Sequence, residues 1–94
     1  MADKTRADVE EWLSNNYPDE DVLIADGLDA AFIGLAHRAA NAHPVAAYRF
    51  QKVIEIFEER DGMTRDEAFE FFDYNVIGAY VGDGTPVFVE AMDE

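Results

Sequence analysis

Two consecutive helical patterns between residues 50 and 76 constrain the fold of this chain most strongly. In each, apolar residues recur every three or four positions, which aligns their side chains on one helix face. The first face consists of Phe50, Val53, Ile54 and Phe57, and the second of Ala68, Phe69, Phe72 and Val76. Because each face needs an apolar partner, the sequence predicts a hairpin of two helices that share one core.

The residues between the two patterns are typical of a helix end followed by a helix start. Gly62 suits the left-handed backbone that closes many helices. Thr64 and Glu67 have the spacing of a capping box, in which a hydroxyl and a carboxylate bind the first free amides of a helix. We expect the second helix to run from residue 65 to about residue 74 and to give way near Asn75.

An earlier amphipathic segment predicts a third helix over residues 6–16. Thr5 and Asp8 form a second capping-box pattern before it. Val9 and Trp12 then follow at helical spacing, so one side of this helix should pack on the rest of the protein.

Five short segments predict strands, because they are rich in β-branched, aromatic or small apolar residues and are bounded by turn signals. They are residues 22–25, 31–38, 45–48, 76–81 and 87–89. The third is ambiguous, since its two alanines also suit a helix. The order of elements predicts one α+β domain, residues 1–94, with two layers. A mostly antiparallel sheet of four to five strands would pack against the helical hairpin and the N-terminal helix.

Acidity is the dominant property of the composition. The chain has 21 acidic and seven basic residues, a formal net charge of −14. Direct binding to nucleic acid or to an anionic membrane is disfavoured, because both depend on cationic contacts to phosphate. A charged partner should therefore be basic. Solubility or adaptation to high salt would explain the same acidity, and this alternative stays open.

Patterns for catalysis, cofactors and metals are missing from the sequence. The chain has no cysteine and one serine, and His37 and His43 stand six positions apart without a further ligand motif. We expect a non-enzymatic protein without a cofactor or metal, located in the cytoplasm because no signal peptide or membrane span is evident. A weaker alternative is an acid–base enzyme or small-ligand binder that uses the loop between the second strand and the first hairpin helix.

Two sets of residues are candidates for binding a partner. Carboxylates on rigid helices can occupy the Lys and Arg sites that otherwise hold nucleic-acid phosphates. These candidates are Glu55, Glu58, Glu59, Asp66, Glu70 and Asp73. The second set is Phe71 and Tyr74, on the flank of the second hairpin helix. They would either wrap the core of the monomer or mediate self-association into a homodimer.

Three stretches resemble a group of small, largely uncharacterised proteins that are common in bacteriophage and mobile-element genomes. They are "DGLDAAFIGLAHR", "PVAAYRFQKVIEIFEERDGMTRDEAFEFFDYNVIGAYVGDGTP" and "VFVE", which together cover about residues 23–90. The resemblance implies a small accessory protein made in a host cytoplasm, and it favours a strand at residues 45–48. It carries no catalytic motif.

These observations favour a phage-type inhibitor that binds a basic, nucleic-acid-handling host protein through a DNA-mimic surface. Anti-CRISPR proteins act in this manner, and a CRISPR effector would be one such target. The alternative is a small structural or regulatory phage protein that self-associates and owes its charge to solubility or salt.

Overall fold

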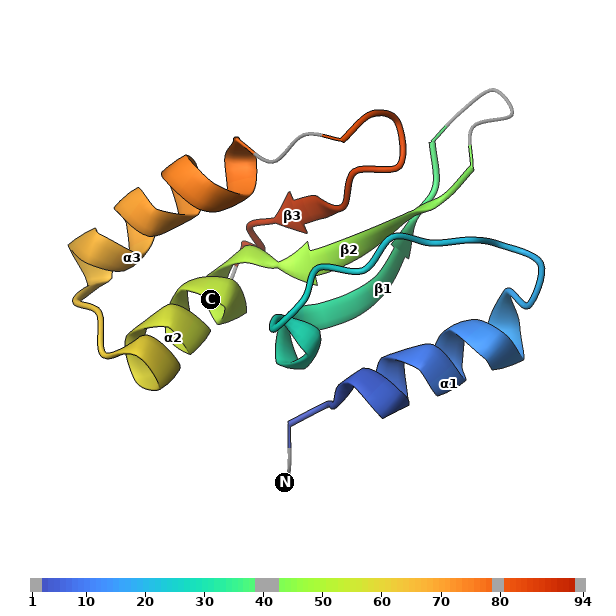
Figure 1. The fold of residues 1–94 in the computed structure, drawn as a ribbon, viewed down its shortest axis with the longest axis horizontal. Helices are drawn as coiled ribbons and strands as arrows, with labels where there is room; N and C mark the ends of the chain where they lie inside the picture. The colour runs from blue at the N-terminus through green and yellow to red at the C-terminus, as the bar shows by residue number, and fades with distance from the viewer. Residues whose placement is uncertain (1–2, 39–42, 79–80, 93–94) are drawn as a thin grey trace.

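The chain folds into an α+β arrangement in the computed structural model, which describes residues 3–38, 43–78 and 81–92 (Figure 1). The elements are α1 (Arg6–Asn16), a 3₁₀ turn η1 (Asp29–Ala31), β1 (Phe32–Ala36), β2 (Val45–Arg49), α2 (Phe50–Asp61), α3 (Arg65–Phe71), a π-helix η2 (Phe72–Ile77) and β3 (Val87–Val89). Helix α1 runs beside β1, while α2 and α3 lie side by side at the other end of the molecule.

The strands form one mixed sheet in the order β1-β2-β3. Strands β1 and β2 are antiparallel, with a register shift between Phe32 and Gly34. Strand β3 pairs with β2 in parallel and sets Phe88 beside Tyr48. Within the described residues the sheet thus has three strands, fewer than the four to five expected, and only one of its two pairings is antiparallel.

Residues 22–25 were expected to form a strand but form an irregular segment outside the sheet. The amide of Ala25 donates to the hydroxyl of Tyr48 at 2.8 Å. Val22, Ile24 and Ala25 are partly buried against the core. Their apolar character therefore reflects packing over the core, which β-propensity does not distinguish from strand pairing.

The strand expected at residues 76–81 is also wrong where the structure describes it. Residues 76 and 77 end the π-helix η2, which continues directly from α3. Residues 79 and 80 lie outside the described part of the chain. The segment 87–89, expected to return as a hairpin partner of 76–81, instead pairs with β2.

The three helices are confirmed. Helix α1 begins at a capping box in which Thr5 accepts from the amide of Asp8, and Thr64 and Glu67 make the same arrangement before α3. Helix α2 ends at Gly62, whose φ of 69° is in the left-handed region. The α-helical part of α3 ends at Phe71, earlier than expected, because the π-helix takes over.

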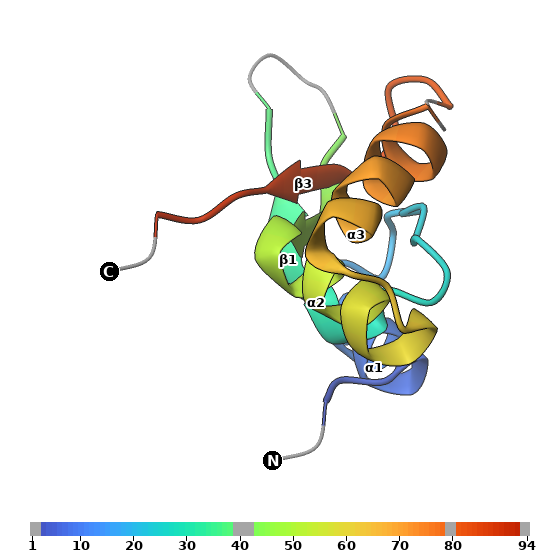
Figure 2. The same ribbon diagram turned by 90° about the vertical axis from the view of Figure 1, so that its left-hand side faces the viewer.

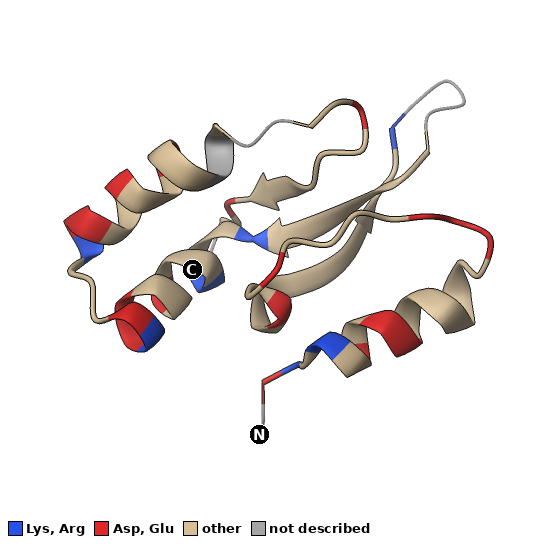
Figure 3. Cartoon of the chain, viewed as in Figure 1, with Lys and Arg blue, Asp and Glu red and all other residues tan. Residues whose placement is uncertain are grey.

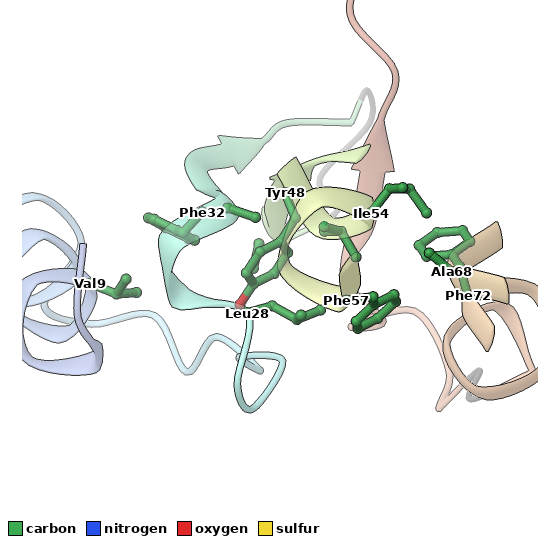
Figure 4. Packing of buried hydrophobic residues seen from close by; sticks show 11 residues of the cluster. Val9, Leu28, Phe32, Tyr48, Ile54, Phe57, Ala68 and Phe72 are labelled. Atoms are coloured by element: carbon green, nitrogen blue, oxygen red, sulfur yellow. The ribbon is translucent and has the colours of Figure 1, made fainter. Parts of the chain in front are cut away.

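One apolar core joins all these elements (Figure 4). It extends from Val9 of α1 through Tyr48 of β2 to Phe72 at the start of η2. The ring of Phe72 meets Phe50 and Phe88 edge-on, with centroids 4.9 and 5.1 Å away. Figure 2 shows α3 and most of α2 to one side of the sheet, while the chain after β3 leads away on the other. Helix α3 is thus fixed to the core along one side and free along the other.

Candidate interaction surface on helix α3

Two of the three predicted acidic residues of α2 form ion pairs with nearby cations. Glu55 accepts from Lys52 at 2.9 Å, and this hydrogen bond raises the pKa of Lys52. Glu58 accepts from Arg65 at 3.2 Å. Glu59 is exposed and borders a shallow depression that also includes Lys52. Two of the three predicted acids of α2 are therefore paired with a cation.

Three predicted acidic residues of α3 and η2 are exposed and unpaired in the described part of the chain. Asp66, Glu70 and Asp73 are all exposed, and Figure 3 shows acidic residues following one another along this helix. Within the described part of the chain, their carboxylates have neither an ion pair nor a hydrogen bond. They fall at i, i+4 and i+7, the spacing of one helix face. We call these three residues the α3 acidic row.

An open groove of about 930 Å³ lies along α3 and η2. Its lining includes Met63, Glu67, Glu70, Phe71, Asp73 and Tyr74. The groove brings together two members of the acidic set and both members of the aromatic set. Glu55, Glu58 and Glu59 do not contribute to it. We call this feature the α3 groove.

The two aromatic residues of the groove differ in how they are held. Phe71 is 36% exposed and packs edge-on against Phe57 of α2, with ring centroids 4.9 Å apart. Tyr74 is 85% exposed. Phe71 therefore belongs partly to the core of the monomer, which is one of the two alternatives that the sequence left open. The ring of Tyr74, in contrast, is exposed to solvent.

Two further acids line the groove but are already engaged. Asp61 accepts from the guanidinium of Arg60 through both carboxylate oxygens, at 3.1 Å each, and this contact lowers the pKa of Asp61. Glu67 accepts from the amide of Thr64 at 2.9 Å as part of the capping box. Glu70 and Asp73 are the groove acids that remain available.

The sequence named Glu67 for the capping box and placed neither Glu67 nor Met63 among the candidate binding residues, although both line the groove. A signal for Glu67 was present, because Glu67, Glu70 and Tyr74 recur at i, i+3 and i+7 and so share one face. Met63 precedes the helix, so no periodic pattern could have placed it there.

The other candidate sites of the sequence are not supported as clusters. His37 lies 3.2 Å from the hydroxyl of Tyr17, and His43 lies 3.0 Å from Glu20. In the described residues, no group of three or more possible metal ligands comes together. The loop proposed for an acid–base or ligand site before α2 includes strand β2, and residues 39–42 of it lie outside the described part.

None of the described helices combines the length and the apolar character needed to cross a membrane. Comparison of the chain with family models, with curated proteins and with solved structures yields no match.

Proposed function

We propose that this protein is a non-enzymatic inhibitor that binds a basic, nucleic-acid-handling protein through the acidic side of α3. In this proposal the carboxylates occupy positions on the target that nucleic-acid phosphates would otherwise take. The target is a host protein, such as a CRISPR effector, and the inhibitor is of the kind that phages and mobile elements encode.

The observation that carries this proposal is the contrast in charge pairing along the hairpin. Glu55 and Glu58 of α2 are paired with Lys52 and Arg65, whereas the carboxylates of the α3 acidic row have no such pair in the described residues. The α3 acidic row lies beside an exposed tyrosine on a helix anchored by Ala68 and Phe72. A rigid row of unpaired charge with an aromatic group beside it suits an interface with a basic protein.

The resemblance to small phage and mobile-element proteins supports the same proposal. Such proteins act inside a host cell, where basic nucleic-acid-binding proteins are abundant targets. The absence of a catalytic motif in the resembling segments agrees with an inhibitor that acts by occupancy.

The test is capture of a target from a host lysate treated with nuclease, so that nucleic acid does not bridge the proteins. Immobilised protein should retain a basic nucleic-acid-binding protein at low salt, and retention should weaken as salt rises because exposed charges are screened. Duplex DNA added afterwards should compete with the inhibitor for the captured protein. If no basic nucleic-acid-binding protein is retained at either salt concentration, the proposal is wrong.

The exposure of Tyr74 favours a second candidate function, a structural or regulatory protein that self-associates. At 85% exposure this ring is available for a contact with another copy. Two chains of charge −14 repel one another, so a dimer should strengthen with salt, opposite to target binding. Sedimentation of the native chain and of Tyr74→Ser at two salt concentrations separates the candidates. A native chain that stays monomeric in both buffers rules out self-association.

A further inference from the structure

The α3 groove combines three features that suit one particular side chain of a partner. Its aromatic edge is the ring of Tyr74, which is 85% exposed. The carboxylates of Glu70 and Asp73, beside this ring in the groove, have no partner in the described residues. Among the described residues that line the groove there are four carboxylates and no basic side chain.

We propose that the α3 groove is an arginine-binding site, which receives an arginine side chain from a loop or tail of the basic partner. The guanidinium plane stacks on the ring of Tyr74, and its N–H groups donate to the carboxylates of Glu70 and Asp73. This inference rests on the proposed function for the basic character of the partner, and it names the chemical group that the site selects.

Charge complementarity identifies the occupant as cationic, and the aromatic ring selects arginine over lysine. A guanidinium is flat, is weakly hydrated and presents several donors in one plane, so it can stack and donate at the same time. A lysine ammonium is a compact, strongly hydrated charge, which gains less from the face of the ring. The acids attract both cations through charge, and a guanidinium can in addition donate two N–H groups to the carboxylates.

The groove is also preorganised on the side where the arginine would rest. Phe71 is held against Phe57 at a centroid distance of 4.9 Å, and the following residue, Phe72, is buried. The backbone that carries Glu70 and Asp73 is therefore anchored before any partner arrives, which lowers the entropic cost of binding.

The experiment compares two blocked peptides, Gly-Arg-Gly-Arg-Gly and Gly-Lys-Gly-Lys-Gly, which have equal charge. Each is titrated into the full chain at low salt, and backbone amide shifts are followed by NMR. We expect the arginine peptide to bind about threefold more tightly or better, with the largest shifts at residues 66–75. Equal affinity for the two peptides, or shifts centred elsewhere, overturns the proposal.

Variants separate the two parts of the site. Tyr74→Leu should weaken binding of the arginine peptide more than binding of the lysine peptide, whereas Tyr74→Phe should keep the full preference because it keeps the ring. Glu70→Gln with Asp73→Asn should weaken both peptides by about fivefold or more. The matched control is Glu11→Gln with Asp19→Asn, two exposed acids outside the groove that remove the same charge. Unchanged arginine preference in Tyr74→Leu overturns the stacking role, and equal weakening by the control overturns the role of the two acids.

The peptide titration and the lysate capture test the two proposals independently. If the chain captures a basic protein from the lysate but shows no preference for the arginine peptide, the arginine-site proposal is wrong and the inhibitor proposal is retained. If the arginine peptide binds as expected but no basic protein is captured, the inhibitor proposal is wrong and the arginine-site proposal is retained.

Discussion

Helices α2 and α3 pack against each other and have similar compositions of Phe, Glu and Asp, yet they use these residues differently. Helix α2 buries Val53, Ile54 and Phe57 and pairs two of its glutamates with cations. Helix α3 buries Ala68, and Phe72 is buried where the π-helix begins. The acids and aromatics left over on α3 are exposed together. Two neighbouring segments of similar composition thus differ in structure: the apolar side chains of α2 pack in the core, whereas acidic and aromatic side chains of α3 stay exposed to solvent.

The largest expected effect compares two rings that face each other across the hairpin. Phe57 of α2 is 2% exposed, and Phe71 of α3 is 36% exposed. Phe57→Ala should lower the free energy of unfolding by about 3–5 kcal/mol, because it leaves a cavity in the core. Phe71→Ala should lower the free energy of unfolding by about 1–2 kcal/mol, because it removes the ring contact with Phe57 and the burial of part of the side chain. Urea unfolding measures both. Equal losses would mean that the two helices do not differ in packing.

The next effect concerns Tyr48 of β2, which is fully buried in contrast to Tyr74. Its hydroxyl accepts from the amide of Ala25 at 2.8 Å, so Tyr48→Phe leaves that amide unpaired. We expect a loss of about 1–2 kcal/mol at neutral pH. Tyr74→Phe, at an exposed site, should change the free energy of unfolding by less than about 0.5 kcal/mol. A comparable loss in both variants would contradict the assigned burial.

Tyr48 also predicts an alkaline loss of stability. Burial raises the pKa of its hydroxyl above the ordinary value of 10.0, and the Ala25 amide opposes this only in part. The folded state therefore favours the neutral phenol. This contribution is complete below the ordinary pKa and is lost as pH rises through the raised one. Denaturant unfolding across this range should show a steeper decline in the native chain than in Tyr48→Phe, and parallel declines would contradict it.

A smaller effect is expected at the start of α3. Thr64→Ala removes the hydroxyl that accepts from the amide of Glu67, and this should cost about 1 kcal/mol. Thr64→Ser keeps a hydroxyl and is the matched control. In thermal unfolding, the Tm of Thr64→Ser should lie close to that of the native chain and above that of Thr64→Ala. If alanine and serine behave alike, the hydroxyl does not stabilise α3.

The smallest effect concerns the ion pair that joins the two helices. Arg65 and Glu58 have 69% and 26% of their side chains exposed. Arg65→Gln should change the free energy of unfolding by less than about 0.5 kcal/mol, because solvent screens such pairs. A loss above about 1 kcal/mol would show that the pair stabilises the fold and does more than neutralise Glu58.

Local chemistry was sufficient to predict the helices of this chain. The bounds of α1, the two capping boxes and the left-handed Gly62 all depend on residues within a few positions of one another. The buried stripe of α2 follows from the same short-range periodicity. Strand β2 forms where two alanines left the local assignment open and the resemblance favoured a strand.

Long-range pairing could not be predicted in this way. Strand β3 pairs with β2, about 40 residues earlier, and no local pattern selects that partner over a neighbouring hairpin strand. Val76 and Ile77 are β-branched and suggested a strand, yet they end the π-helix η2. For the site, the sequence named the acids, but whether Glu58 or Glu70 meets a cation from another element depends on how the helices pack.

In the proposed function, the location of the negative charge on α3 determines binding, rather than the total charge of the chain. Two variants test it directly: Asp66→Asn with Glu70→Gln and Asp73→Asn on α3, and Glu55→Gln with Glu58→Gln and Glu59→Gln on α2. Each removes three negative charges, and thermal unfolding checks that both remain folded. Capture of the basic target from nuclease-treated lysate should fall about tenfold or more in the α3 variant and stay near the native level in the α2 variant. Equal losses in the two variants, or native capture by the α3 variant, would contradict the claim.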